Sequence, residues 1–175
     1  MDITRPIAPN PYELLPQFPS FTLTSETVID GDVMPYECAG VGDNISPQLS
    51  WSGFPEETCS FVLTCFDPDA PTPAGFWHWC VIDLPTAITS LEFGAGNGDE
   101  SLPAGFHVRN DSNEPAYMGA APPVGDHPHR YIFTVYALDV ESLELDPADS
   151  TPTRVAFTAL FHTLATAQLT VTYQR

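Results

Sequence analysis

The chain of 175 residues contains no lysine, and its only permanently cationic side chains are five arginines. Twenty-three aspartate and glutamate residues oppose them, so the formal net charge is -18 at pH 7. A protein surface of that charge repels polyanions, which makes nucleic acid and anionic membrane surfaces unfavourable partners. The acidic residues are scattered along the chain rather than gathered in a tail, which indicates a solubilising surface.

Long apolar runs and targeting signals are also lacking. No apolar run is long enough to span a bilayer, so no transmembrane segment is predicted. Residues 1–21 have no basic stretch followed by an apolar core, so we interpret them as mature sequence rather than a signal peptide. The four cysteines show no Cys-x-x-Cys spacing and three lie in or beside strand-like runs, which favours buried free thiols and a cytoplasmic location.

Proline is abundant, and it defines the expected organisation. Five of the nineteen prolines fall within residues 1–20, which predicts an extended N-terminal arm. Residues 21–175 are long enough for one domain with a sizeable core, and 43% of the whole chain is hydrophobic. The remaining prolines favour stiff loops over a helix-rich body.

The hydrophobic patterning predicts a mostly β protein with peripheral helices. Residues 94–125 are turn-rich, and irregular segments of that length tend to be functional. Thr151 before Pro152 marks the start of a helix near the C-terminus. The predicted buried face of this helix comprises Phe157, Leu160, Phe161 and Leu164. The predicted strands are Phe21–Thr24, the end of Asn44–Trp51, Ser60–Phe66, Phe76–Asp83, His129–Asp139 and Gln168–Tyr173.

Two carboxylates and a histidine flank the loop between two of these strands. If residues 60–66 and 76–83 pair as an antiparallel hairpin, Asp67, Asp69 and His78 share one rim of the sheet. Ordinary turn chemistry is the competing interpretation, because Asp and Pro both favour turns.

A second group of polar side chains lies at the start of a later strand. His129 and Tyr131 point the same way from that strand, although each could also be an ordinary core side chain with a polar tip. The spacing matches no strong zinc pattern, so neither a metal nor another cofactor is predicted. Cys80 is expected on the same strand face as His78, but a cysteine in an apolar strand is usually a core residue. No activated nucleophile is evident, so no catalytic residue is assigned.

The chemistry that remains is the binding of a small anion or a phosphorylated head group. A neutral histidine donates one ring N–H, Tyr131 donates its O–H, and backbone N–H groups of residues 119–125 could join them. A carboxylate such as Asp67 would then have to be protonated or paired with a cation.

Several separated motifs resemble the phosphatidylethanolamine-binding protein family, and its bacterial Raf-kinase-inhibitor-like branch in particular. In chain order they are Asn44-Ile45-Ser46-Pro47-Gln48-Leu49-Ser50-Trp51, Asp67-Pro68-Asp69-Ala70-Pro71, His78-Trp79, Pro122-Pro123 with Gly125, His129-Arg130-Tyr131, Tyr136-Ala137-Leu138-Asp139 and Thr172-Tyr173-Gln174-Arg175. The match runs from about Phe21 to the C-terminus.

The resemblance implies a large antiparallel sheet packed on a smaller one, a homodimer, and a shallow pocket for phosphate or a phospholipid head group. By position, the pocket residues are Asp67, Asp69, His78, Ala121 (through its backbone N–H), Pro123, His129 and Tyr131. The leading hypothesis is a non-enzymatic binding module that could regulate a kinase or protease partner. The alternatives are a hydrolase with an Asp/His acid–base pair and an interaction inhibitor whose pocket is vestigial.

Overall fold

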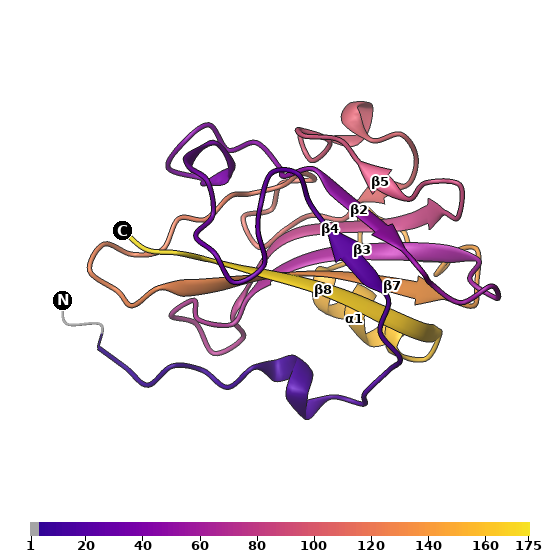
Figure 1. The fold of residues 1–175 in the computed structure, drawn as a ribbon, viewed down its shortest axis with the longest axis horizontal. Helices are drawn as coiled ribbons and strands as arrows, with labels where there is room; N and C mark the ends of the chain where they lie inside the picture. Colours follow the sequence, from indigo (N-terminus) through magenta and orange to yellow (C-terminus); the bar gives the residue numbers. More distant parts are fainter. Residues whose placement is uncertain (1–3) are drawn as a thin grey trace.

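In the computed structural model, which describes residues 4–175, two antiparallel sheets pack face to face (Figure 1). The larger sheet has five strands in the order β6-β4-β3-β7-β8, and the smaller one has the order β1-β2-β5. The strands are β1 (Thr22–Thr24), β2 (Leu49–Ser52), β3 (Ser60–Asp67), β4 (Phe76–Pro85), β5 (Ser90–Leu91), β6 (Phe106–His107), β7 (His129–Leu138) and β8 (Thr163–Tyr173). The predicted fold class is confirmed.

Strand β3 forms the centre of the large sheet. Every residue from Ser60 to Asp67 is buried, because β4 and β7 flank the strand and both of its faces are covered. On one face, Phe61, Leu63 and Cys65 belong to the main core between the two sheets. On the other face, Val62 belongs to a second apolar cluster beneath the helix.

The one α-helix within residues 4–175, α1 (Pro152–Leu160), begins as predicted. The Thr151 side chain accepts a hydrogen bond from the backbone N–H of Arg154, and Pro152 occupies the first turn. The predicted buried face is wrong, because the helix ends at Leu160. Its buried residues are Pro152, Val155 and Ala159, whereas the side chains of Phe157 and Phe161 are 64% and 68% exposed. Leu164 lies in β8, where strand pairing replaces the helical spacing.

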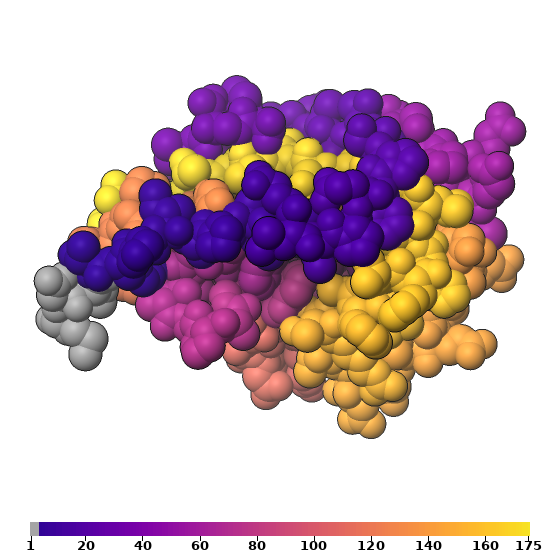
Figure 2. Space-filling model, turned by 90° about the horizontal axis from the view of Figure 1, so that it is seen from below, coloured from indigo at the N-terminus to yellow at the C-terminus, as the bar shows by residue number. Residues whose placement is uncertain are grey.

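The described part of the chain also has three short 3-10 helices: η1 (Pro11–Leu14), η2 (Tyr36–Cys38) and η3 (Asp99–Ser101). The first lies in the N-terminal arm, which Figure 2 shows in indigo across one face of the molecule. Tyr12 of this arm packs against the second apolar cluster. Residues 1–3 of the predicted arm lie outside the described residues.

The four cysteines are unpaired. Cys38, Cys65 and Cys80 are buried, as predicted for core thiols, but Cys59 is exposed just before β3. No helix within residues 4–175 is long and apolar enough to cross a membrane.

Candidate functional site

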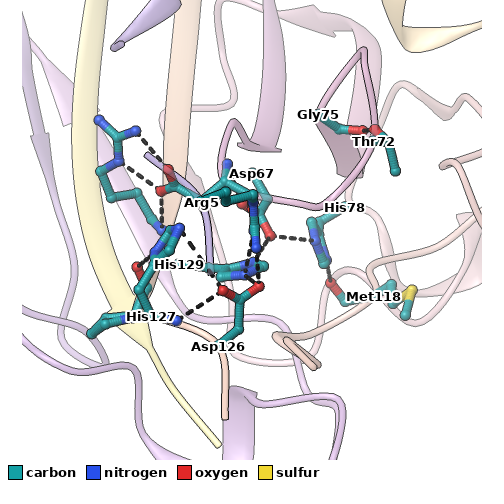
Figure 3. Close-up of polar contacts among 12 residues, drawn as sticks. Arg5, Asp67, Thr72, Gly75, His78, Met118, Asp126, His127 and His129 are labelled. Atoms are coloured by element: carbon teal, nitrogen blue, oxygen red, sulfur yellow. Dashed lines mark hydrogen bonds and ion pairs between the residues drawn. The ribbon is translucent and has the colours of Figure 1, made fainter. Parts of the chain in front are cut away.

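The site forms where three neighbouring strands begin or end. Asp67 closes β3 and pairs with Phe76 at the start of β4, which confirms the predicted hairpin. On its other side, β3 pairs antiparallel with β7, which begins at His129. Antiparallel order therefore brings polar residues that are 62 positions apart in sequence into contact at one end of the sheet (Figure 3).

A pocket of about 170 Å³ opens at this end of the sheet. Six of the seven residues predicted to line a ligand site line this pocket: Asp67, His78, Ala121, Pro123, His129 and Tyr131. The remaining lining residues, which were not among the predicted ligand residues, are Ala70, Pro71, Thr72, Phe76, Met118 and Pro122.

The loop that carries Ala121 and Pro123 is held against the rest of the fold by close backbone contact. The Gly119 N–H donates to the Asn44 side chain at 2.7 Å. A Cβ at Gly119 would lie only 2.2 Å from the carbonyl oxygen of Cys38, so no larger residue fits there without a shift of the backbone. Asn44 thereby positions one wall of the pocket from a distant part of the chain.

His129 lies between two buried carboxylates. Its Nδ1 contacts Asp67 Oδ2 at 2.8 Å, and its Nε2 contacts Asp126 Oδ2 at 3.0 Å. Carboxylates, which only accept, face both ring nitrogens, and this arrangement favours the imidazolium form of the ring. Burial alone would lower the pKa of His129, but the hydrogen bonds to Asp67 and Asp126 raise it above the ordinary value. Asp67 is therefore paired with a cation, one of the two states expected for a carboxylate beside an anion.

The pKa of His78 is shifted in the opposite direction from that of His129. Its Nδ1 lies 2.8 Å from the carbonyl oxygen of Met118, so Nδ1 carries the proton and donates. Burial lowers the pKa of His78, and the nearby Asp67 carboxylate only partly compensates, with 3.9 Å between His78 Nε2 and Asp67 Oδ2. A neutral His78 presents an unprotonated Nε2, which accepts a hydrogen bond.

An irregularity in strand pairing aims His78 at the pocket. Cys65 pairs with Trp79 and Phe66 with Trp77, which leaves His78 as an extra residue on β4. Such a bulge changes the alternation of side chains along a strand. Thus the His78 ring contacts Tyr131 on the pocket face, at 5.0 Å between ring centroids, whereas Cys80 packs in the cluster on the opposite face. The predicted shared face of His78 and Cys80 is therefore wrong.

Tyr131 contributes an unused polar group. Its side chain lines the pocket, and its buried hydroxyl has no hydrogen-bond partner within residues 4–175. Burial, reinforced by the Asp67 carboxylate, holds the pKa of Tyr131 far above its ordinary value, so the hydroxyl keeps its proton. A buried hydroxyl left unpaired is energetically costly, and a ligand oxygen in the pocket would relieve that cost.

The sequence and the fold both match a known family. The family model for phosphatidylethanolamine-binding protein matches residues 24–174. This chain belongs to the phosphatidylethanolamine-binding protein family. It is 45% identical over 157 residues to the UPF0098 protein YbhB of Escherichia coli strain K12, and the alignment covers 86% of this chain and 98% of YbhB.

Solved structures give the same result. The crystal structure of E. coli YbcL, described as a new member of the mammalian PEBP family, has a TM-score of 0.85 and 39% sequence identity, covering 89% of this chain and 99% of YbcL. A phosphatidylethanolamine-binding protein from Plasmodium vivax, 14% identical with a TM-score of 0.51 over 87% of this chain and 86% of that one, shares the fold alone. The predicted family is confirmed.

Within this phosphatidylethanolamine-binding protein fold, Asp69 lies apart from the pocket. Its carboxylate accepts from Arg130 Nε at 2.7 Å, from Nη2 at 2.8 Å and from the Arg130 backbone N–H at 3.0 Å. Burial opposes ionisation, but these bonds to Arg130 hold the pKa of Asp69 below its ordinary value. Asp69 also donates its backbone N–H to Asp67 Oδ1 at 2.8 Å, which fixes the turn between the two carboxylates.

Sequence reasoning missed two charged residues of the cluster, Asp126 and Arg5. Arg5 Nη1 lies 2.6 Å from Asp126 Oδ2, and Nη2 donates to the carbonyl oxygen of Asp69. Asp126 precedes His129 by only three positions, and this short spacing could have indicated that the two side chains are in contact. Arg5 had none, because it comes from the N-terminal arm and lies before the residues that match the family model.

Proposed function

We propose that the pocket binds a small anion or a phosphorylated head group resembling phosphoethanolamine, and that the protein is a non-enzymatic binding module. The observation that carries the proposal is the Tyr131 hydroxyl, a buried donor that lines the pocket without a partner in the described chain. The volume of about 170 Å³ also supports it. This volume is below the roughly 300 Å³ at which drug-sized ligand sites begin, so it suits a head group better than an acyl chain.

The proposed ligand contacts follow from the protonation states. Tyr131 donates its O–H to a ligand oxygen, and the imidazolium of His129, which also lines the pocket, supplies positive potential there. Neutral His78 accepts at Nε2, so it pairs with a protonated ligand oxygen or with an ammonium group. The ligand class we propose therefore carries both an acceptor and a donor, as a hydrogen phosphate or phosphoethanolamine does. Ala121 and Pro123 also line the pocket, and Asp69 acts indirectly by fixing Arg130.

A titration followed by NMR tests this proposal. We expect inorganic phosphate and phosphoethanolamine to shift the ring resonances of His78 and His129. His162, an exposed histidine bonded to Asp139, is the internal control and should not respond. The absence of any shift at millimolar ligand would refute the pocket as an anion site.

Tyr131→Phe sharpens the test, because it removes only the unpartnered hydroxyl. We expect the affinity for phosphate to fall about three- to tenfold, as for loss of one hydrogen bond, without loss of folding stability. Tyr117→Phe is the matched control, since the Tyr117 hydroxyl donates to the Cys38 carbonyl at 2.8 Å within the core. That variant should lose stability and keep its affinity for phosphate.

A hydrolase with an Asp/His acid–base pair is the second candidate, and the Asp67–His129 contact of 2.8 Å favours it. However, both ring nitrogens of His129 are already bonded to carboxylates, so His129 is poorly placed to move a proton to or from a substrate. A panel of ester, peptide and phosphoester substrates decides the matter. Turnover that disappears in His129→Ala would favour the hydrolase over the binding module.

Partners and assembly are further parts of the proposal. We propose a homodimer and a regulatory role toward a kinase or protease, both drawn from the family resemblance. Analytical ultracentrifugation tests the dimer. Partner capture that survives Asp67→Ala and His129→Ala would favour an inhibitor with a vestigial pocket. A cytoplasmic location is supported by three buried, unpaired cysteines.

A further inference from the structure

The N-terminal arm lies outside the family match, yet it reaches the candidate site. The match begins at residue 24, whereas the arm is bonded to the sheet at two points before that. The backbone N–H of Thr166 in β8 donates to the Pro19 carbonyl at 2.9 Å, and Arg130 Nη2 donates to the Ala8 carbonyl at 2.6 Å. Figure 2 shows the N-terminal arm, in indigo, running across one face of the molecule. This path brings Arg5 to the end of the sheet where the pocket opens.

Arg5 contacts three parts of the site at once. Its Nη1 forms the ion pair with Asp126, and its Nη2 donates to the Asp69 carbonyl oxygen and lies 3.4 Å from His129 Nε2 (Figure 3). The Arg5 side chain is 26% exposed, and that of Asp126 is only 2% exposed. Burial alone would raise the pKa of Asp126, but the hydrogen bonds from His129 and Arg5 hold it well below its ordinary value.

The charges of the cluster balance only when Arg5 is counted. Three carboxylates, those of Asp67, Asp69 and Asp126, are bonded to three cations, namely the imidazolium of His129 and the guanidinium groups of Arg130 and Arg5. Without Arg5 the cluster would carry a net negative charge, and it would oppose the entry of an anion into the adjacent pocket. The chain has no lysine and a net charge of -18, so no surplus of cations elsewhere would offset the negative charge of the cluster.

We propose that Arg5 is a positioning residue of the anion site, carried to it by the arm. Arg5 neutralises Asp126, fixes Asp126 against the pocket-lining His129, and thereby raises the affinity of the pocket for an anion. Arg5 does not itself line the pocket. It forms part of a neighbouring hollow that shares Ala70, Pro71 and Thr72 with the pocket, so the arm supports the site from behind and leaves the pocket open. The statement about affinity rests on the proposed function, whereas the coupling of Arg5 to His129 does not.

Three single-residue variants of the full chain test the inference. Arg5→Gln removes the charge, Arg5→Lys keeps it, and Arg154→Gln removes an exposed arginine from α1, which packs against the opposite face of the large sheet. The first readout is the pKa of His129, measured by NMR titration of its ring. The titratable and charged groups near that ring are Asp67, Asp126, His127, His78 and Arg5. The second readout is the dissociation constant for inorganic phosphate.

Removal of a positive charge beside an imidazolium favours protonation. We therefore expect Arg5→Gln to raise the pKa of His129 by about half a unit or more, with Arg5→Lys and Arg154→Gln close to wild type. In the same variant we expect the affinity for phosphate to fall about three- to tenfold, with recovery in Arg5→Lys. A merely structural arm contact would not move the His129 pKa in this charge-dependent way.

An unchanged His129 pKa in Arg5→Gln would overturn the inference, and so would phosphate binding by that variant at the wild-type affinity. A wild-type protein that binds no phosphate would overturn the proposed function and the affinity statement. The coupling of Arg5 to His129 would still be decided by the pKa measurement, so the two failures are distinguishable.

Discussion

The pocket is lined by two histidines that differ in charge, because His129 is held as a cation and His78 as a neutral ring. Two carboxylates hold His129 as an imidazolium with both nitrogens engaged. A backbone carbonyl orients His78, whose burial favours the neutral ring. The comparison teaches that the groups behind a histidine, rather than the histidine itself, decide whether it presents a cation or an acceptor to a ligand.

The largest expected effect is on the free energy of unfolding, which should fall more when His129 is removed than when His78 is removed. His129→Ala leaves Asp67 and Asp126 buried without their shared cation, so we expect the free energy of unfolding to fall by about 3 kcal/mol at neutral pH. His78→Ala leaves only the Met118 carbonyl without its donor and opens a small cavity, which should cost less, about 1–2 kcal/mol. Urea denaturation of both variants measures the difference. Equal losses would mean that the carboxylates do not depend on His129.

Removal of one carboxylate sharpens the comparison further. Asp126→Asn takes away one of the two anionic partners of His129 and leaves the positive charge of Arg5 uncompensated beside the ring. We therefore expect the pKa of His129 to fall toward its ordinary value of about 6.5, and that of His78 to change little. NMR titration of both rings measures this. Asp149→Asn, which removes an exposed carboxylate before α1, is the control, and an equal response there would point to a general charge effect.

The smallest expected effect is the pH dependence of stability, which should have opposite sign for the two histidines. The pKa of His129 is raised on folding, so its stabilisation is fully present below the unfolded value of about 6.5 and is lost as pH rises through the folded-state pKa. The pKa of His78 is lowered on folding, so stability falls as pH drops below about 6.5 toward its folded-state pKa.

Denaturation of wild type, His129→Ala and His78→Ala across pH 5 to 8 tests this, with roughly 1.4 kcal/mol expected for each pKa unit of difference between the folded and unfolded states. Relative to wild type, His78→Ala should lose less stability toward acid pH, and His129→Ala should lose less toward alkaline pH. The same slope in all three proteins would contradict the contrast between the two histidines.

Much of the fold could be predicted because alternation and turn chemistry are local properties. Strands β3, β4, β7 and β8 were recognisable from their apolar and β-branched residues. Thr151 with Pro152 marked the start of α1. The end of that helix was not recognisable, because Phe161 and Leu164 continue the helical spacing past Leu160. Pairing of β8 with β7 takes over from Thr163 onward, and tertiary hydrogen bonding overrides the local pattern.

The residues of the candidate site could likewise be predicted only in part from the sequence. Asp67, His78, His129 and Tyr131 could be predicted because a hairpin and a strand start place polar residues at one end of a sheet. The face on which His78 lies could not be predicted, since a bulge between Trp77 and Trp79 changes the alternation. Arg5 could not be predicted either, because a contact across more than a hundred residues leaves no local periodicity.

The sequence by itself determined the architecture, the family and the polar residues at the sheet end, because these follow from short-range patterning and recognisable motifs. Only the tertiary structure decided the charges within the site. It placed His129 between two carboxylates, kept His78 neutral against a carbonyl, and brought Arg5 to Asp126. The physical reason is that protonation depends on burial and on partners within a few ångströms, and the fold alone assembles those partners.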